Sequence, residues 1–181
     1  MPGFFAARSK DEHALRHPRN DVRESDAHGP SGCHRCPAHV HLECFGERPD
    51  RPLCVLPEDH LRVADLVAIT PPEPIAKFLA ARNYLPRGVP LLKHVLGLTG
   101  QTVCRIHLDI LIDGIVTATA RERDRNGRPL PDWQGCRRIA GGENFLMNWQ
   151  ATDLLDGRYF GPLPAASIIG RVVPLYTFEA L

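Results

Sequence analysis

The stretch LPRGVPLLKHVLGLTGQTV, Leu85 to Val103, contains a single lysine, Lys93, within an otherwise apolar run that ends at the turn pair Thr99-Gly100. Lysine is seldom found among apolar residues unless it is paired, reaches water or has a chemical role. In one interpretation, this is a half-buried strand with Lys93 on its solvent-facing side. In the other, Lys93 is buried, and desolvation lowers its pKa until it can act as a general base near neutral pH.

The sequence on both sides of this stretch predicts a mainly β fold with one short inserted helix. Residues 61–69, LRVADLVAI, form a β-like run that ends at prolines, and residues 73–85 have the spacing of an amphipathic helix. Residues 101–120 predict consecutive strands, because Asp113-Gly114 is a strong hairpin signal. We expect a last strand at residues 168–178.

Residues 1–54 have a different composition from the remainder of the chain. They hold six of the nine histidines and four of the six cysteines, and they show no sustained apolar period. We therefore predict two parts, an irregular segment at 1–54 and a β domain at 55–181. Cys33, Cys36, His39 and Cys44 have spacings that can close a tetrahedral zinc site, which is one alternative function for the segment.

Composition and charge exclude several functions. A formal net charge of +1 predicts no attraction to nucleic acid. No apolar run reaches the roughly 18 residues that a membrane span needs, and the amino terminus lacks the apolar core of a secretory signal. Taken literally, the sequence predicts a cytosolic protein, and nothing in it indicates a cofactor.

Three blocks together resemble the type I signal peptidase family of serine–lysine endopeptidases, in particular its conjugative-transfer (TraF-type) branch. RVADLVAI is similar to an Arg-Gly-Asp-Val strand of the family, with Ala64 in place of glycine. RGVPLLKHVLGLTGQTV is similar to the block that carries the general-base lysine. GGENFLMNW with DGRYFGPLP is similar to the final Gly-Asp-Asn and Ser-x-Asp-x-Arg block.

The resemblance implies a β-rich domain at the periplasmic face of the inner membrane, held by an amino-terminal anchor that this sequence does not show. Its substrates would be precursor polypeptides of the conjugative transfer apparatus, such as pilin precursors. Lys93 would be the general base, and Asn144, Leu154, Asp156 and Arg158 would support the site. The spacing of Asp156 and Arg158 suits an ion pair that braces a turn.

Cys104 and Cys136 resemble a cysteine pair of the same branch. In an oxidising compartment a bridge between them would contribute about 3–4 kcal/mol on the loop-entropy model. In the cytosol they would be inert thiols.

Two positions depart from the family pattern. Leu154 stands where the family has a serine that orients the lysine, and Thr152, close in sequence, is a candidate to substitute for it. The nucleophile is also missing: it should precede Leu61 in a pattern like Ser-x-Pro-x-Gly-x-Tyr, and none of the four serines, Ser9, Ser25, Ser31 and Ser167, has that context.

A reading-frame hypothesis accounts for the missing serine. LECFGERPDRPLC, Leu42 to Cys54, can be back-translated with permitted codons and read one base later as WNASASVPIGLY. This string contains Ser-Val-Pro-Ile-Gly-Leu-Tyr at the expected distance from RVADLVAI. The sequence thus indicates a signal peptidase that is inactive as written. The alternatives are a non-catalytic relic that binds extended peptides, and the zinc-binding interaction protein.

Overall fold

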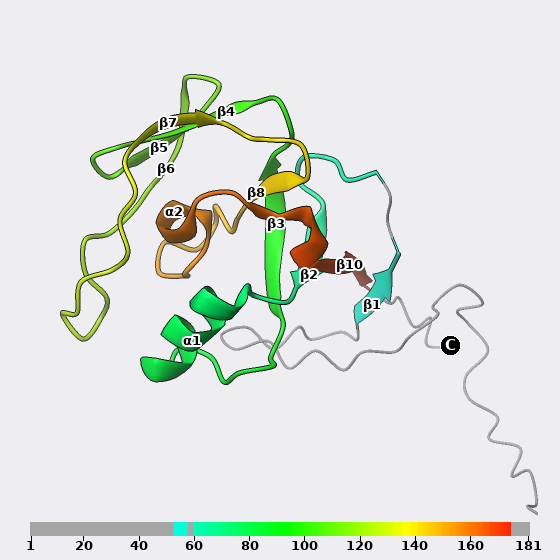
Figure 1. Ribbon diagram of the computed structural model, residues 1–181, viewed down its shortest axis with the longest axis horizontal. Helices are drawn as coiled ribbons and strands as arrows, with labels where there is room; N and C mark the ends of the chain where they lie inside the picture. Colours follow the sequence, from blue (N-terminus) through cyan, green and yellow to red (C-terminus); the bar gives the residue numbers. More distant parts are fainter. Residues whose placement is uncertain (1–52, 58–59, 175–181) are drawn as a thin grey trace, which may run out of the picture. The chain divides into compact units, whose positions relative to one another are not determined.

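Two β-sheets dominate the part of the chain that the computed structural model describes, residues 53–57 and 60–174 (Figure 1). The prediction of a mainly β fold with a short inserted helix is confirmed. No helix among the described residues is long and apolar enough to cross a membrane. Residues 1–52, with the four candidate zinc ligands, lie outside the described residues.

The larger sheet has six strands and carries the stretch around Lys93. Its strands, in spatial order, are β1 (Leu53–Leu56), β10 (Ile168–Pro174), β2 (Leu66–Ile69), β3 (Leu91–Gly97), β8 (Glu143–Met147) and β9 (Leu163–Pro164). Every pairing between neighbours is antiparallel. The central strand β3 pairs with β2 along Leu91–His94, but with β8 only from His94 onward.

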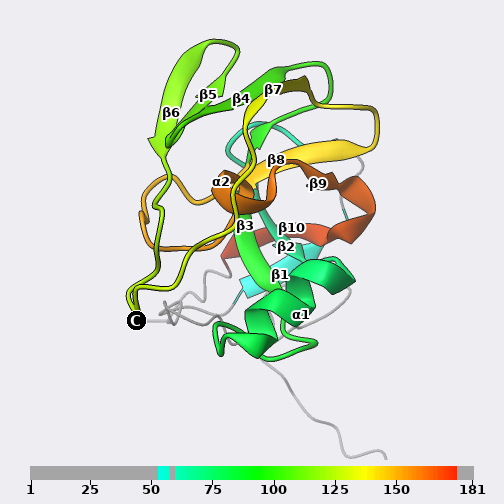
Figure 2. The same cartoon turned by 60° about the vertical axis from the view of Figure 1, so that its left-hand side comes forward.

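The smaller sheet has four strands in the order β6 (Ile115–Thr119), β5 (Asp109–Ile112), β4 (Thr102–Ile106) and β7 (Gly135–Arg138). The turn between β5 and β6 is the predicted Asp113-Gly114, whose φ angles of 49° and 82° are both positive. Such a turn matches the twist of the flanking strands, which is why this dipeptide is a reliable hairpin signal. Between β6 and β7 a long loop extends beside the helix α1 (Figures 1 and 2).

The helices are short. Helix α1 covers Glu73–Ala81 and ends four residues earlier than the sequence predicts, because Asn83 has a positive φ of 57°. A second helix, α2 (Gly157–Phe160), forms where the sequence predicts only a turn braced by Asp156 and Arg158, and a 3-10 turn at Ala165–Ser167 precedes β10.

Strand β8 lies between two apolar clusters. Phe145 and Met147 pack against the small sheet, with Val103, Ile110, Ile112 and Ile139. Leu146 points to the opposite side and packs with Val67, Val95 and Leu163 of the larger sheet. Because successive strand residues point to opposite faces, one short strand contributes to both cores and joins the two sheets.

Ala64 adopts a backbone conformation that normally requires glycine. Residues 61–69 are not one strand as predicted: β2 begins only at Leu66, and a turn at residues 62–65 precedes it. In this turn Ala64 has a φ of 76°, its N–H donates to the Val95 carbonyl oxygen at 2.8 Å, and the Asp65 carboxylate accepts from the Arg62 N–H. The glycine that the resemblance implies at this position therefore suits the turn better than the alanine that is present.

Replacing Ala64 with glycine should raise the free energy of unfolding by about 0.5–1 kcal/mol. The left-handed conformation costs a non-glycine residue about 1–2 kcal/mol, and glycine would remove this cost. Part of the gain is lost, because glycine loses more backbone entropy than alanine on folding. Urea denaturation measures the change. The matched control is Ala68→Gly, a buried position in β2 without a positive φ, which should lower stability instead. Equal destabilisation by both substitutions would contradict the strain at Ala64.

A disulfide joins Cys104 of β4 to Cys136 of β7, directly opposite each other in the ladder, with 4.0 Å between their Cα atoms. It closes a loop with a sequence separation of 32 that includes the β5–β6 hairpin and the long loop that follows it. We expect Cys104→Ala/Cys136→Ala to lower the free energy of unfolding by about 3–4 kcal/mol under oxidising conditions, because the unfolded chain regains loop entropy. The difference from wild type should shrink in dithiothreitol. An unchanged urea midpoint for the variant in oxidising buffer would refute this expectation.

Candidate functional site

A groove of about 1080 Å³ opens beside the amino-terminal half of β3. One wall is formed by α1 and the residues after it, and a second by the long loop between β6 and β7. The loop after β8 forms a third wall, and Leu53 at the start of β1 also lines the groove. Segments that are far apart in the sequence thus meet at one place, where β3 forms the floor.

Lys93 lies on this floor and is buried, with a relative exposure of only 4%. On β3 it shares the buried face with Val95 and Gly97. The residues between them, His94 and Leu96, are only partly buried. The first interpretation, a lysine on the solvent-facing side of a strand, is therefore wrong. Among the described residues, no side chain forms a hydrogen bond or ion pair with the Lys93 ammonium.

Burial lowers the pKa of Lys93, because the charged form loses hydration. Two charged neighbours act on it in opposite directions: the Asp156 carboxylate raises the pKa and the Arg158 guanidinium lowers it. The two charges belong to one ion pair and offset each other in part, so desolvation determines the sign. A lysine with a lowered pKa and a free amine is the state that a general base needs.

Asp156 and Arg158 form a buried ion pair with two contacts, Nε to Oδ1 at 2.9 Å and Nη2 to Oδ2 at 2.8 Å. Their side chains are 0% and 1% exposed. Asp156 also caps α2, where its side chain accepts a hydrogen bond from the Arg158 N–H at 3.1 Å. The paired geometry and the added hydrogen bonds offset the desolvation of both charges.

Arg158 also holds the loop after β8. Its Nη2 donates to the carbonyl oxygens of Asn148, Ala151 and Leu154, at 3.3, 2.6 and 3.4 Å. These contacts fix the backbone around Leu154, which lines the groove with an apolar side chain. Leu154 thus adds to the desolvation of the site, although it offers Lys93 no hydrogen bond.

Asn148 is a groove residue that no motif in the sequence marked. Its Oδ1 accepts from the His94 N–H, and its Nδ2 donates to the Leu92 carbonyl oxygen, both at 3.2 Å. The side-chain amide thus takes the place of a neighbouring strand next to Lys93, at the point where β8 has ended. Its own N–H donates to Asp156 Oδ2 at 3.2 Å, which links β3 to the buried ion pair. Only its position directly after strand β8 signals this role.

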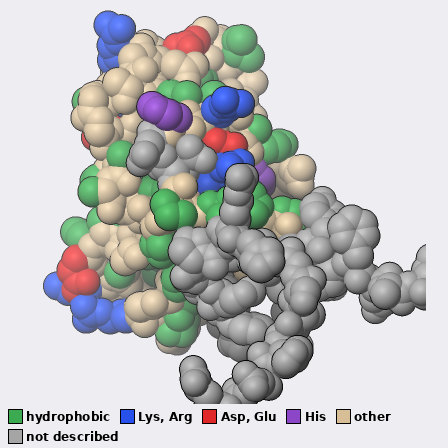
Figure 3. All heavy atoms as spheres, turned by 90° about the vertical axis from the view of Figure 1, so that its right-hand side faces the viewer, with side chains coloured by type: hydrophobic (Ala, Val, Ile, Leu, Met, Phe, Trp, Pro, Cys, Tyr) green, Lys and Arg blue, Asp and Glu red, His purple; other side chains and the backbone are tan. Residues whose placement is uncertain are grey.

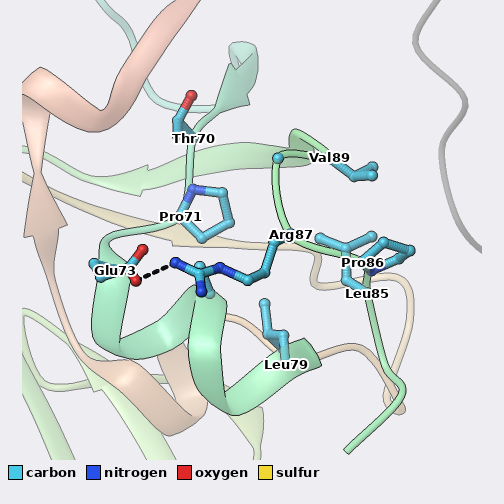
Figure 4. A pocket seen from close by; sticks show the side chains of 10 residues that line it. Thr70, Pro71, Glu73, Leu79, Leu85, Pro86, Arg87 and Val89 are labelled. Carbon is cyan, nitrogen blue, oxygen red and sulfur yellow. Dashed lines mark hydrogen bonds and ion pairs between the residues drawn. The ribbon is translucent and has the colours of Figure 1, made fainter. Parts of the chain in front are cut away.

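Asn144 and Thr152, the remaining candidates from the resemblance, form contacts of their own, and Arg87 of the lysine block lies in another pocket. Asn144 is buried in β8 opposite Leu163 and is not among the described residues that line the groove. Thr152 accepts a hydrogen bond from Arg121 Nη2 at 3.3 Å. Arg87 pairs with Glu73 in a separate, smaller pocket of about 230 Å³ between α1 and the segment that leads to β3 (Figure 4).

The described residues supply no serine to the groove. Ser167 is part of the 3-10 turn before β10, where its hydroxyl donates to the Pro164 carbonyl oxygen at 2.6 Å, and it does not line the groove. Ser9, Ser25 and Ser31 lie outside the described residues. The groove therefore contains the features of a base without a nucleophile from the described part of the chain.

Replacing Lys93 with methionine should raise the free energy of unfolding at pH 7 by about 1–4 kcal/mol, the range for replacing buried ionic groups with packed apolar side chains. The pKa of Lys93 is lower in the folded chain than its ordinary value of 10.5, so between the two values the unfolded chain binds more protons. Wild-type stability then rises with pH in this window, and the advantage of the variant should narrow towards pH 10.5. Urea denaturation between about pH 7 and about pH 10 measures the gap.

The matched control is Lys77→Met on α1, where the lysine side chain is 65% exposed. This substitution should produce a small change that does not vary over the same pH range, because the lysine remains hydrated. A gap for Lys93→Met that stays constant with pH would show that the pKa of Lys93 is not lowered.

Comparisons with known proteins identify the family of this chain. A family model described as signal peptidase, peptidase S26, matches residues 47–177, well over half of the chain. The chain is 33% identical over 125 residues to a probable conjugal transfer protein TraF of Sinorhizobium fredii, covering 64% of this chain and 65% of that protein. It is 35% identical over 145 residues to the conjugal transfer protein TraF of Agrobacterium fabrum, covering 72% and 80%.

A signal peptidase I from Enterococcus faecalis is similar at 19% identity and a TM-score of 0.37, over 62% of this chain and 97% of that one. The aligned part of this chain spans slightly less than two thirds of the Sinorhizobium protein. The family match covers all three blocks on which the resemblance rests, including the strand that carries Lys93. The chain belongs to the type I signal peptidase family (peptidase S26), on the branch of the conjugal transfer TraF proteins.

Proposed function

We propose that this chain is a serine–lysine endopeptidase domain that removes signal or pro-segments from precursor polypeptides of conjugative transfer, at the periplasmic face of the inner membrane. In the sequence as it stands the nucleophile is missing, so the chain is inactive. The observation that carries the proposal is Lys93, a buried lysine with a lowered pKa on the floor of a large groove. The conjugal transfer relatives support the substrate class and the location.

In the proposed reaction, the neutral Lys93 amine accepts the proton of a serine hydroxyl as its oxygen attacks the peptide carbonyl. The ammonium then returns the proton to the leaving amine, and water releases the acyl group by the reverse sequence. The opposite effects of Asp156 and Arg158 on the pKa of Lys93 favour this proton cycle. The Asp156 carboxylate alone would stabilise the Lys93 ammonium and slow the return of its proton.

The shape of the groove supports a polypeptide substrate. Strand β3 pairs with β8 only from His94, which leaves the edge at Leu91–Lys93 facing the groove. An extended chain can pair with a strand edge through its own backbone, and the peptide bond to be cut would then lie next to Lys93. Asn148 already bonds the Leu92 carbonyl oxygen and the His94 N–H on this side of β3, so a bound chain would pair with the part of the strand before these two groups.

The entry of β1 supports the proposed position of the serine. Leu53, the first residue of β1, lines the same groove as Lys93. In the string WNASASVPIGLY, which would replace Leu42–Cys54, the motif serine comes six residues before the final tyrosine. A chain that leaves β1 at Leu53 begins at the groove wall, and a few residues at about 3.3 Å each can reach the floor.

Restoring the serine tests the proposal. We expect the variant in which WNASASVPIGLY replaces Leu42–Cys54 to cut a fusion protein that carries small residues, as in Ala-x-Ala, before a labelled segment. Mass spectrometry of the products locates the cut. Replacing the motif serine with alanine, WNASAAVPIGLY, should abolish cleavage, and so should Lys93→Met in the restored variant.

Leu154 favours a second candidate, a relic of the same fold that binds extended peptides without cutting them. A restored variant that binds the fusion protein but yields no product would support the relic and contradict the endopeptidase. The native protein offers an independent check of the reading frame by mass spectrometry. The hypothesis is wrong if purified native protein yields the peptide LECFGERPDRPLC.

A further inference from the structure

One wall of the groove is a loop with a high density of arginine, RERDRNGRPLP, Arg121 to Pro131. Arg121, Arg123 and Arg125 all line the groove, together with Asp124 and Asn126. The proposed cleavage reaction uses none of them. Their role in binding is therefore a separate question from the chemistry at Lys93.

The loop is held in place by its own contacts. The Asp124 carboxylate accepts hydrogen bonds from the N–H groups of Asn126 and Arg128, at 2.9 and 2.8 Å, and forms an ion pair with Arg128 at 2.7 Å. Tyr84, just after α1, donates its hydroxyl to the same carboxylate. Arg82 Nη1 donates to the Pro129 carbonyl oxygen at 2.6 Å, which fastens the loop to α1. The arginines thus extend from an anchored wall.

The two acidic side chains that line the groove are already engaged. Asp124 has the partners just described, which hold the pKa of its carboxyl below the ordinary range. Asp153, on the loop after β8, forms an ion pair with Arg125 across the groove. Neither carboxylate is left for the other two arginines.

Arg121 and Arg123 have no carboxylate partner among the described residues. Arg121 Nη2 donates to Thr152 Oγ1 at 3.3 Å, and Arg123 Nη1 donates to the Gly127 carbonyl oxygen at 2.8 Å. Each guanidinium has five N–H donors, so most remain free. By contrast, the face of the molecule in Figure 3 shows side chains of opposite charge close together, blue beside red.

We propose that the groove selects polypeptide segments with acidic side chains, which Arg121 and Arg123 bind while the backbone of the segment lies along β3. The inference rests on the proposed function, since it adds a charge preference to the same groove. Arginine suits this role because its planar fork can hold a carboxylate through two hydrogen bonds. Small residues at the cleavage site and acidic residues near it would together define the substrate.

Peptide binding tests the charge preference without any cleavage. The probes are two extended peptides of alanine and glycine that differ only in carrying two glutamates or two glutamines, each with an uncharged fluorescent label. In about 50 mM salt, fluorescence anisotropy with the full chain should give a Kd about fivefold lower for the glutamate peptide, as expected for two exposed ion pairs. In about 0.5 M salt the ratio should fall below about twofold, because the charges are screened.

The variant Arg121→Gln/Arg123→Gln should bind the two peptides equally. The matched control is Arg62→Gln/Lys77→Gln, which removes the same charge from exposed positions outside the groove and should keep the preference. A preference that survives in the first variant, or equal binding by the wild type, would overturn the inference. So would a single-stranded oligonucleotide that displaces the glutamate peptide as effectively as unlabelled peptide, since the arginines would then serve nucleic acid.

The outcome separates this inference from the endopeptidase proposal. Acidic preference in binding without cleavage by the serine-restored variant would reject the endopeptidase and keep the charge selection. Cleavage by the restored variant, at equal rates for fusion proteins with glutamate or glutamine near the cut, would reject the charge selection and keep the endopeptidase.

Discussion

The buried ion pair between Asp156 and Arg158 is the contact on which the rest of the site depends. It caps α2 through Asp156, fixes the N–H of Asn148, and gathers three carbonyl oxygens of the loop after β8. Two charges at 0% and 1% exposure are stable only because nearly every donor and acceptor finds a partner. Loss of either residue would leave a buried charge unpaired. It would also remove hydrogen bonds that hold the loop after β8, which forms one wall of the groove.

The same pair explains how the pKa of a lysine can be lowered beside a carboxylate. Asp156 alone would favour the Lys93 ammonium, but Arg158 lies against it and offsets part of its field. Burial, to which the strand position of Lys93 and the apolar side chain of Leu154 both contribute, then lowers the pKa of Lys93. A serine in place of Leu154 could orient the amine, whereas leucine only excludes water. Under the proposed function, this chain would therefore have a desolvated base but no serine hydroxyl at position 154 to orient it.

Local signals in the sequence predicted the features that local chemistry determines. Asp113-Gly114 specified its hairpin because both positions need a positive φ. The lone lysine in an apolar run singled out Lys93 but left its burial open, which the structure resolves. Asn148 was not predictable in the same way, because its role depends on where β8 ends relative to β3. The second helix also escaped prediction: GRYF has no helical period, and α2 forms because Asp156 caps it and Gly157 fits closely against Phe145.

The smaller sheet is coupled to the site through one buried arginine that no motif indicated. Arg105 of β4, 2% exposed, donates to the carbonyl oxygen of Arg158 at 2.9 Å and to that of Pro131 at 3.2 Å. It thus joins the buried ion pair to the end of the arginine-rich loop, and the disulfide from Cys104 lies next to it in β4. Because a buried guanidinium must keep its acceptors, a shift of the small sheet would move both walls of the groove together. The width of the groove therefore depends on the packing of the two sheets, and this argues that the second sheet serves the geometry of the proposed substrate site as well as stability.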